Sequence, residues 1–193
     1  MEISSQEKLL TEIVKILDSL QIKYFITGGF AVSVWGRPRA TFDIDIVVKI
    51  IEPQADKLAD AWKNISKAGY ADKAAAKEAI KNKGEFNFID PESGLKVDFW
   101  TEKEDKNNPP EFKNRKFKRI SGQKVFFVSP EDLILSKLRW YELSRSERHI
   151  SDIKSVFKLS GKKLNEKYLN YWIAKLNLVE IIKNNGIDFG GHS

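Results

Sequence analysis

The stretch FITGGFAVSVWGRPRATFDIDIVV, residues 25–48, decides the fold, because it joins a glycine pair to a strand that carries two aspartates. Side chains alternate between the faces of a strand, so Asp43 and Asp45 point to one face and the isoleucines between them to the other. Neighbouring carboxylates repel each other, and a proton or a bound cation relieves that repulsion. Hard oxygen ligands suit magnesium. The stretch therefore favours an enzyme that handles phosphate.

A third aspartate, Asp98, lies in the sequence LKVDFW, which reads as a second strand. Two acids on one strand and a third on a neighbouring strand can ligate two magnesium ions, as in phosphoryl or nucleotidyl transfer. Asp98 is also suited to accept the proton of an attacking hydroxyl. We therefore predict that Asp43, Asp45 and Asp98 are catalytic residues and ligands of two Mg²⁺ ions. Each acid alone is more often a solvated or salt-bridged residue, so the prediction depends on their convergence.

The glycine pair supplies a phosphate cradle. Gly28 and Gly29 lack Cβ atoms, so backbone amides at this turn can approach a triphosphate closely. A short helix expected over residues 30–35 would point its N-terminus at that anion. Arg37, Arg39 and Thr41 follow on one loop and are suited to bind phosphate oxygens. The predicted nucleotide-binding residues of this segment are Thr27, Gly28, Gly29, Arg39 and Thr41.

The composition excludes several kinds of site. The 193 residues include no cysteine, so disulfides, thiol catalysis and cysteine-ligated metal centres are ruled out. With no signal-peptide pattern and no apolar run of membrane-spanning length, we expect a cytoplasmic protein without a membrane partner. The net charge of +6 favours polyanionic partners, nucleotides or nucleic acid among them, although a generic lysine-rich protein would carry the same charge.

The expected elements indicate an α+β fold, in which a mixed β-sheet flanked by helices is followed by an α-helical C-terminal part. Ser129 has the character of a helix cap, and Pro130 suits the first helical position. We therefore divide the chain into a catalytic core over residues 1–128, a helical part over residues 129–188 and a flexible tail over residues 189–193.

Two further segments carry positive charge. Residues 71–81 are rich in Ala and Lys, which predicts a helix. Residues 112–120 are expected to form a strand of a hairpin, and their basic side chains alternate with Phe112 and Phe117. This strand is suited to follow a nucleic-acid backbone with aromatic stacking. It is equally suited to be a charged edge that blocks strand pairing, so both interpretations stay open.

The Gly-Gly turn, the short helix, the Asp-Ile-Asp strand and the later strand aspartate together resemble the polymerase-β-type nucleotidyltransferase superfamily. Within it, GRPRATFDIDIVV resembles the AbiEii-like group of type IV toxins. The resemblance implies that Gly28 and Gly29 hold the nucleotide phosphates, that Asp43 and Asp45 bind two magnesium ions, and that Asp98 is third ligand and base. Many members have Gly-Ser at the turn, so the hydroxyl of that serine is missing here.

The segment SPEDLILSKLRWY, residues 129–141, resembles the C-terminal helix of the same group, in which a lysine contacts nucleotide phosphate. Lys137 is the matching residue and is predicted to bind nucleotide, and Asp152 matches a downstream acid. The alternative is that Lys137 only borders an apolar helix stripe, with its ammonium group extended to solvent.

The predicted reaction is transfer of a nucleoside monophosphate from a nucleoside triphosphate to an acceptor hydroxyl. A tRNA or other RNA acceptor, in a toxin-like role with an antitoxin partner, suits the positive charge and the resemblance. An antibiotic such as an aminoglycoside, or a protein hydroxyl, is the enzymatic alternative, and the acid-rich residues 90–105 leave room for a polycationic acceptor. The alternative without catalysis is a nucleotide-binding antitoxin or sensor, against which the presence of all three acids argues.

Overall fold

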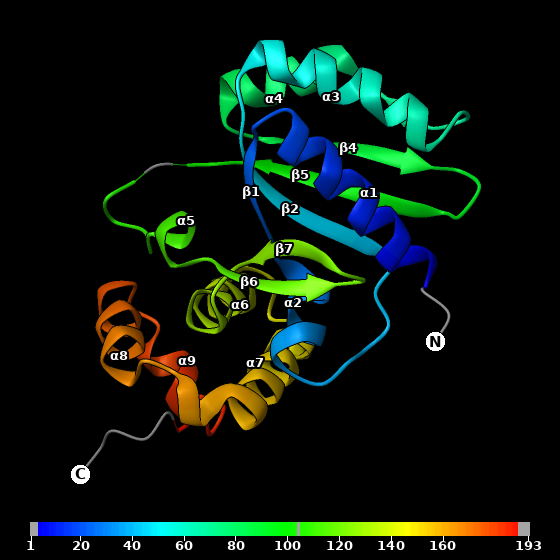
Figure 1. The fold of residues 1–193 in the computed structure, drawn as a ribbon. Helices are drawn as coiled ribbons and strands as arrows, with labels where there is room; N and C mark the ends of the chain where they lie inside the picture. Colours follow the sequence, from blue (N-terminus) through cyan, green and yellow to red (C-terminus); the bar gives the residue numbers. More distant parts are fainter. Residues whose placement is uncertain (1–3, 104, 189–193) are drawn as a thin grey trace.

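Seven strands form one mixed sheet at the centre of the computed structural model, which describes residues 4–103 and 105–188 (Figure 1). The strand order is β3-β4-β5-β2-β1-β7-β6; β5 runs parallel to β2 and β7 parallel to β1, and the other neighbours are antiparallel. The strands are β1 (Lys23–Ile26), β2 (Asp43–Lys49), β3 (Tyr70–Ala71), β4 (Glu85–Asp90), β5 (Leu95–Thr101), β6 (Lys116–Ile120) and β7 (Gln123–Phe127).

Helices pack on both faces of the sheet. In Figure 1, α3 and α4 lie above it, α1 crosses in front of its strands, and α2, α6 and α7 lie below it with the later helices beside them. The helices are α1 (Ser5–Ser19), α2 (Gly28–Trp35), α3 (Glu52–Ile65), α4 (Lys73–Asn82), α5 (Glu111–Asn114), α6 (Pro130–Ser144), α7 (Glu147–Ser160), α8 (Glu166–Lys175) and α9 (Val179–Asn184), with a 3₁₀ turn at Gly161–Lys163. None of these helices has the length and apolar character needed to cross a membrane.

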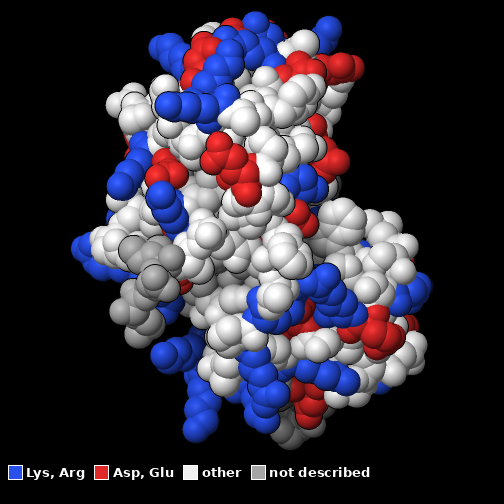
Figure 2. All heavy atoms as spheres, turned by 90° about the vertical axis from the view of Figure 1, so that its right-hand side faces the viewer, with Lys and Arg blue, Asp and Glu red and all other residues white. Residues whose placement is uncertain are grey.

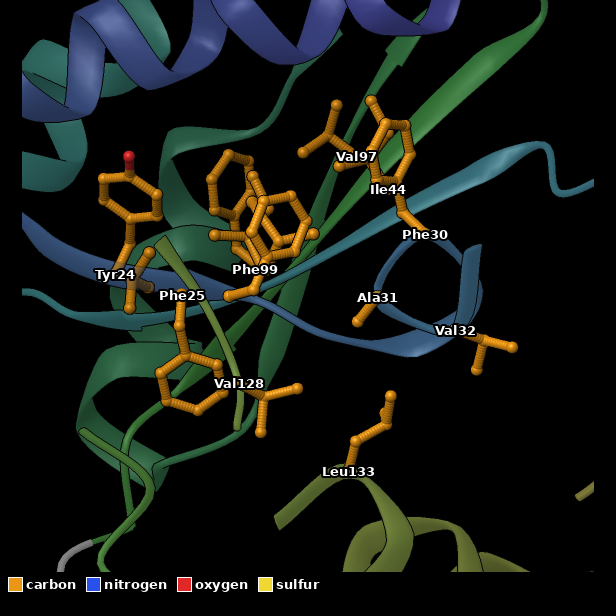
Figure 3. Close-up of a cluster of buried hydrophobic side chains, with 14 of the residues drawn as sticks. Tyr24, Phe25, Phe30, Ala31, Val32, Ile44, Val97, Phe99, Val128 and Leu133 are labelled. Atoms are coloured by element: carbon orange, nitrogen blue, oxygen red, sulfur yellow. The ribbon is translucent and has the colours of Figure 1, made fainter. Parts of the chain in front are cut away.

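Strand β2 has apolar side chains on one face and the two predicted catalytic aspartates on the other. Ile44, Ile46 and Val48 are fully buried on one face, whereas Asp43 and Asp45 are half-buried on the other. Burying one such aliphatic side chain contributes about 1.5–3 kcal/mol, so the apolar half of the alternation fixes which way the aspartates face. Figure 3 shows part of this core, to which β1, β2, β5, α2 and α6 contribute side chains.

The expected α+β architecture is confirmed, with helices throughout the chain from Pro130 to Asn184. The Ser129 hydroxyl caps α6 by accepting from the backbone N–H of Asp132 at 3.1 Å. One buried apolar cluster includes Phe127 of β7, Val128 and Leu133 of α6, so the helical part shares its core with the sheet. The division at residue 128 stays a prediction, and the tail predicted over residues 189–193 lies outside the described residues.

Three expected elements were wrong at their starts. The short helix predicted over residues 30–35 begins at Gly28. The helix predicted over residues 71–81 begins at Lys73, because the Asp72 carboxylate accepts from the first backbone N–H groups of α4, at 2.8 and 3.0 Å. The two residues before Asp72 instead form β3 against β4. The strand predicted over residues 112–120 begins at Lys116, because α5 turns the chain after two prolines and packs Phe112 on the ring of Phe25, 4.9 Å between centroids.

Candidate active site

The three predicted acids lie on one face of the sheet. Strands β2 and β5 are parallel neighbours, and their register places Asp45 directly opposite Asp98 and Asp43 opposite Lys96. Paired residues on adjacent strands point the same way, so all three carboxylates face the layer that contains α2. The sheet therefore brings together acids that are 55 positions apart between Asp43 and Asp98 in the sequence.

The Gly28 turn lies directly against Asp45. Gly28 has a φ of +61°, and a Cβ atom added there would stand 1.8 Å from Oδ2 of Asp45. The backbone N–H of Thr27 also donates to the carbonyl of Asp45 at 2.9 Å. Only glycine permits this approach, so the position of the Asp45 carboxylate depends on glycine at this turn.

The same turn opens α2 next to the predicted phosphate-binding loop. Helix α2 begins at Gly28, and the side chain of its N-cap residue, Thr27, makes no capping hydrogen bond. A Cβ on Gly29 would lie 2.7 Å from Oγ1 of Thr41 and 3.2 Å from Nη2 of Arg39. The free N–H groups of α2 and the Arg39 side chain thus adjoin one another, an arrangement that suits an anion.

We predict that Gly28→Ala weakens magnesium-dependent nucleotide binding more than it weakens the fold. An alanine with positive φ costs about 1–2 kcal/mol, and its methyl group must also displace the Asp45 carboxylate. Thermal unfolding and calorimetric titration with nucleotide measure the two effects. Gly94→Ala is the matched control, because Gly94 has a φ of +68° and no atom near its missing Cβ. Equal loss of nucleotide affinity in both variants would contradict the prediction.

The surroundings of Asp45 disfavour the charged form of its carboxyl group. Burial raises the pKa of the Asp45 carboxyl, and the charges of Asp98 and Asp43 raise it further. Lys137 and the indole N–H of Trp100 act in the opposite direction without cancelling the rise in pKa. The Asp45 carboxylate is partly removed from water and lies beside like charges, so a bound cation would stabilise it.

The ammonium group of Lys96 is one cation that lies beside these acids. The Lys96 side chain lies on the same face as the acids, with its ammonium 2.9 Å from Oδ2 of Asp98. The charges of Asp98, Asp43 and Asp45 all raise the pKa of Lys96, the hydrogen bond to Asp98 most strongly. Within residues 4–103 and 105–188, no group of three or more acidic or histidine side chains is arranged to hold a metal ion as it stands. The donors fit a hard divalent cation, but Asp98 must exchange the ammonium for it.

Lys96→Met should therefore increase the affinity of the protein for divalent metal. The partly exposed Lys96–Asp98 pair contributes about 0.2–1 kcal/mol, so removing it should tighten Mn²⁺ binding up to about 5-fold. Titration of free Mn²⁺ by electron paramagnetic resonance measures this. Lys73→Met, which breaks an exposed pair with Asp60, is the control and should change nothing. Weaker binding in Lys96→Met would show that the ammonium assists the metal instead of competing with it.

Arg39 and Lys137 converge on Asp152. The Arg39 guanidinium donates to both oxygens of Asp152, at 2.8 and 3.0 Å, and the Lys137 ammonium lies 2.9 Å from Oδ2. Burial alone would raise the pKa of Asp152, but the two cations outweigh burial and lower it. Lys137 is only 8% exposed, so its ammonium does not extend to solvent as the snorkelling alternative requires. Asp152 instead holds both predicted phosphate ligands beside the acids.

Sequence reasoning missed two residues on the acidic face, Lys96 and Trp100. The alternation of LKVDFW places both on the side of Asp98, so the period-2 pattern contained the signal. Of the predicted residues, Thr27, Gly28, Gly29, Arg39 and Thr41 line the turn and loop beside Asp45, and Lys137 reaches them from α6. Their roles in binding stay predictions.

No protein-family model and no curated protein matches the sequence. Solved structures do match its fold. ANT(2″)-Ia in complex with adenylyl-2″-tobramycin has a TM-score of 0.62 at 16% identity, over 92% of this chain and 98% of that chain. The antigenic nucleotidyltransferase-like protein from Paracoccidioides brasiliensis has a TM-score of 0.57 at 21% identity, over 95% and 93%. The lincosamide antibiotic adenylyltransferase LnuA, lincomycin-bound, has 0.54 at 14%, over 82% and 99%.

The chain has the nucleotidyltransferase fold. The likeness extends over nearly the full length of each of these proteins, so it includes the helical part as well as the sheet. This confirms the fold that the Gly-Gly and Asp-Ile-Asp motifs predict. The narrower resemblance to the AbiEii-like group stays a prediction.

Proposed function

We propose that this protein is a magnesium-dependent nucleotidyltransferase that moves a nucleoside monophosphate from a nucleoside triphosphate to an acceptor hydroxyl. The observation that carries the proposal is the placement of Asp43, Asp45 and Asp98 on one face, against the glycine turn that opens α2. Carboxylates held beside free backbone N–H groups suit a triphosphate with its cations. The nucleotidyltransferase fold supports this reading.

The residues have separate roles in this proposal. Two bound Mg²⁺ ions would stabilise the charge on the attacking and leaving oxygens, with Asp43 and Asp45 as their main ligands. Asp98, once released from Lys96, accepts the proton of the acceptor hydroxyl. The hydroxyl oxygen then bonds to the α-phosphorus, the bond from that phosphorus to the β-phosphate oxygen breaks, and pyrophosphate leaves. The backbone N–H groups at Gly28 and Gly29 bind the departing phosphates.

A basic pocket beside the site supports a polyanionic ligand. It measures about 360 Å³ and lies between the loop after α2 and helix α7, and its lining includes Arg37, Arg39, Lys154 and Lys158. Figure 2 shows the side of the molecule that is on the right in Figure 1. In its lower half, Lys and Arg side chains gather around a few acidic ones. Arg39 joins the pocket to the glycine turn, so a triphosphate or an RNA backbone can extend from one into the other.

The acceptor that we place first is tRNA or another RNA, because the pocket and the net charge of +6 favour a polyanion. A small-molecule acceptor is the second candidate, since two proteins with this fold are the antibiotic-resistance factor ANT(2″)-Ia and an adenylyltransferase of lincosamide antibiotics. A protein hydroxyl is the third.

Incubation with each labelled nucleoside triphosphate, magnesium and total tRNA tests the proposal. Label in tRNA that disappears with Asp43→Ala supports it. Label that appears only in an added aminoglycoside or in protein moves the acceptor assignment. Nucleotide binding without transfer to any of these acceptors favours the sensor or antitoxin alternative.

The toxin-like role and an antitoxin partner rest on the motif resemblance alone. If they hold, expression of the wild-type chain arrests bacterial growth, and Asp43→Ala relieves the arrest at equal expression. Growth that is unaffected by the active enzyme would leave nucleotidyl transfer intact and remove the toxin role.

A further inference from the structure

The acidic face of the sheet is covered unevenly. On the β1 and β2 side, helix α2 packs against the sheet. On the β4 side, the side chains of Glu85, Asn87 and Ile89 are exposed. The register places Asn87 directly opposite Asp98 and Glu85 opposite Trp100. A surface open to solvent therefore begins at Asp98 and extends away from the glycine turn.

Two tryptophans border this open surface. Trp100 on β5 lies two residues from Asp98 on the same face, and its ring contacts that of Trp140 on α6, with centroids 6.1 Å apart and planes at 70°. Trp140 follows Lys137 by three positions on α6, which is the spacing of neighbours on one helix face. It is 45% exposed, so a large ring stands in solvent beside the acids. The Trp100 indole N–H faces the Asp45 carboxylate and lowers its pKa, which fixes that ring inside the site.

The side chains along this open surface are suited to bind a planar ring with polar edges. An exposed indole offers a face for stacking, and stacking on aromatic side chains is how single-stranded nucleic acids are held regardless of sequence. The Asn87 amide supplies two donors and an acceptor for the edge of such a ring. The triphosphate cradle occupies the opposite side of the aspartates, at α2, so a ring on this surface belongs to the acceptor side.

We propose that Trp100 and Trp140, with Asn87, form a stacking subsite for the terminal nucleobase of a nucleic-acid acceptor, whose ribose hydroxyl then faces Asp98. The inference rests on the proposed function with RNA as acceptor and adds the residues that position the reacting end. Base stacking is strong enough to order a flexible RNA terminus, which backbone charges alone leave mobile.

The test compares two single-stranded RNAs of eight nucleotides, one intact and one with an abasic 3′-terminal ribose that keeps its hydroxyls. Fluorescence anisotropy gives their affinities at fixed salt. The wild type should prefer the intact RNA by about 5- to 150-fold, the range for one stacked base. Trp140→Ala should remove this preference and Trp140→Phe should retain most of it. Leu143→Ala is the matched control, because Leu143 is apolar and 77% exposed one turn further along α6.

Three results with the variants would overturn the inference. The first is a base preference unchanged in Trp140→Ala. The second is an equal loss in Leu143→Ala, which would indicate general apolar contact. The third is a Trp140→Ala defect confined to Mg-ATP affinity, which would assign the ring to the donor nucleotide. Calorimetry with each nucleoside triphosphate and magnesium distinguishes failure of the subsite from failure of the proposed function. A wild type that binds none of the nucleotides and no RNA overturns the proposed function as well. A wild type that binds a nucleotide and RNA without base preference overturns the subsite alone.

Discussion

Asp45→Asn should make the metal-free protein more stable while it abolishes magnesium-dependent nucleotide binding. The charged Asp45 is half-buried and stands beside Asp98 and Asp43, so its neutral isostere removes the desolvation and the repulsion together. We expect a gain of about 1 kcal/mol, which for a chain of this size is about 2–4 °C in Tm. Binding of magnesium with nucleotide should fall at least about 100-fold, because the amide is a weak ligand for a hard cation.

The pH dependence of this gain follows from the sign of the shift. The folded-state pKa of Asp45 is raised above its unfolded value of 3.8. Its contribution to the stability of the wild type is therefore full below pH 3.8 and is lost as the pH rises through the folded-state pKa. The wild type and Asp45→Asn should unfold alike in acid and diverge toward neutral pH, with the variant more stable.

Urea unfolding from pH 4 to pH 8, in the presence of a chelator, measures the divergence, and calorimetry measures nucleotide binding. Glu92→Gln is the control, because Glu92 is an exposed acid in the turn between β4 and β5. An Asp45→Asn protein that is less stable than the wild type at neutral pH would show that neighbouring groups already stabilise the charged Asp45 carboxylate in the metal-free protein. Undiminished magnesium-dependent binding would remove Asp45 from the metal site.

Local alternation in the sequence was enough to assign each of the three acids to one face of its own strand. Ile44 and Ile46 are apolar and adjacent to Asp43 and Asp45, so burial of one set forces the other set onto the opposite face. Glycine at position 28 likewise indicated a close approach, because no other residue tolerates the conformation and the missing Cβ together. Such inferences need only the two strands and the turn, and they hold whatever surrounds them.

The rest depended on contacts between distant segments. Arg39 and Asp152 are 113 positions apart, and no periodicity links a loop before β2 to a helix of the C-terminal part. The Lys96–Asp98 pair is local, but its competition with a metal ion appears only when Asp45 is opposite Asp98. The strand expected from residue 112 was wrong for the same reason, since packing of Phe112 on Phe25 overrides the local alternation.

The largest loss of stability should come from Asp152→Asn. This side chain is 3% exposed and forms ion pairs with two cations, of which Lys137 is itself buried. Removing one partner of a buried ion pair leaves an uncompensated charge and costs about 3–5 kcal/mol. For this chain length the Tm should fall by about 6–20 °C. Arg39 is 25% exposed and can be rehydrated, so the cost should fall mainly on Lys137.

The pH dependence has the opposite sign to that of Asp45. The folded-state pKa of Asp152 is lowered below its unfolded value of 3.8, because Arg39 and Lys137 outweigh the effect of burial. Its stabilisation is therefore present above pH 3.8 and is lost as the pH falls through the folded-state pKa. The wild type and Asp152→Asn should differ fully at neutral pH and converge in strong acid.

A double-mutant cycle separates the ion pair from the rest of the structure. Lys137→Met combined with Asp152→Asn should recover part of the loss, with a coupling of about 0.5–3 kcal/mol, because the orphaned ammonium is removed. Denaturant unfolding of the four proteins at pH 7 gives the coupling. Losses that simply add would mean that Lys137 finds another partner when Asp152 is gone, with Asp45 the nearest candidate on electrostatic grounds. In that event Asp152 would stabilise the fold without positioning the lysine beside the acids.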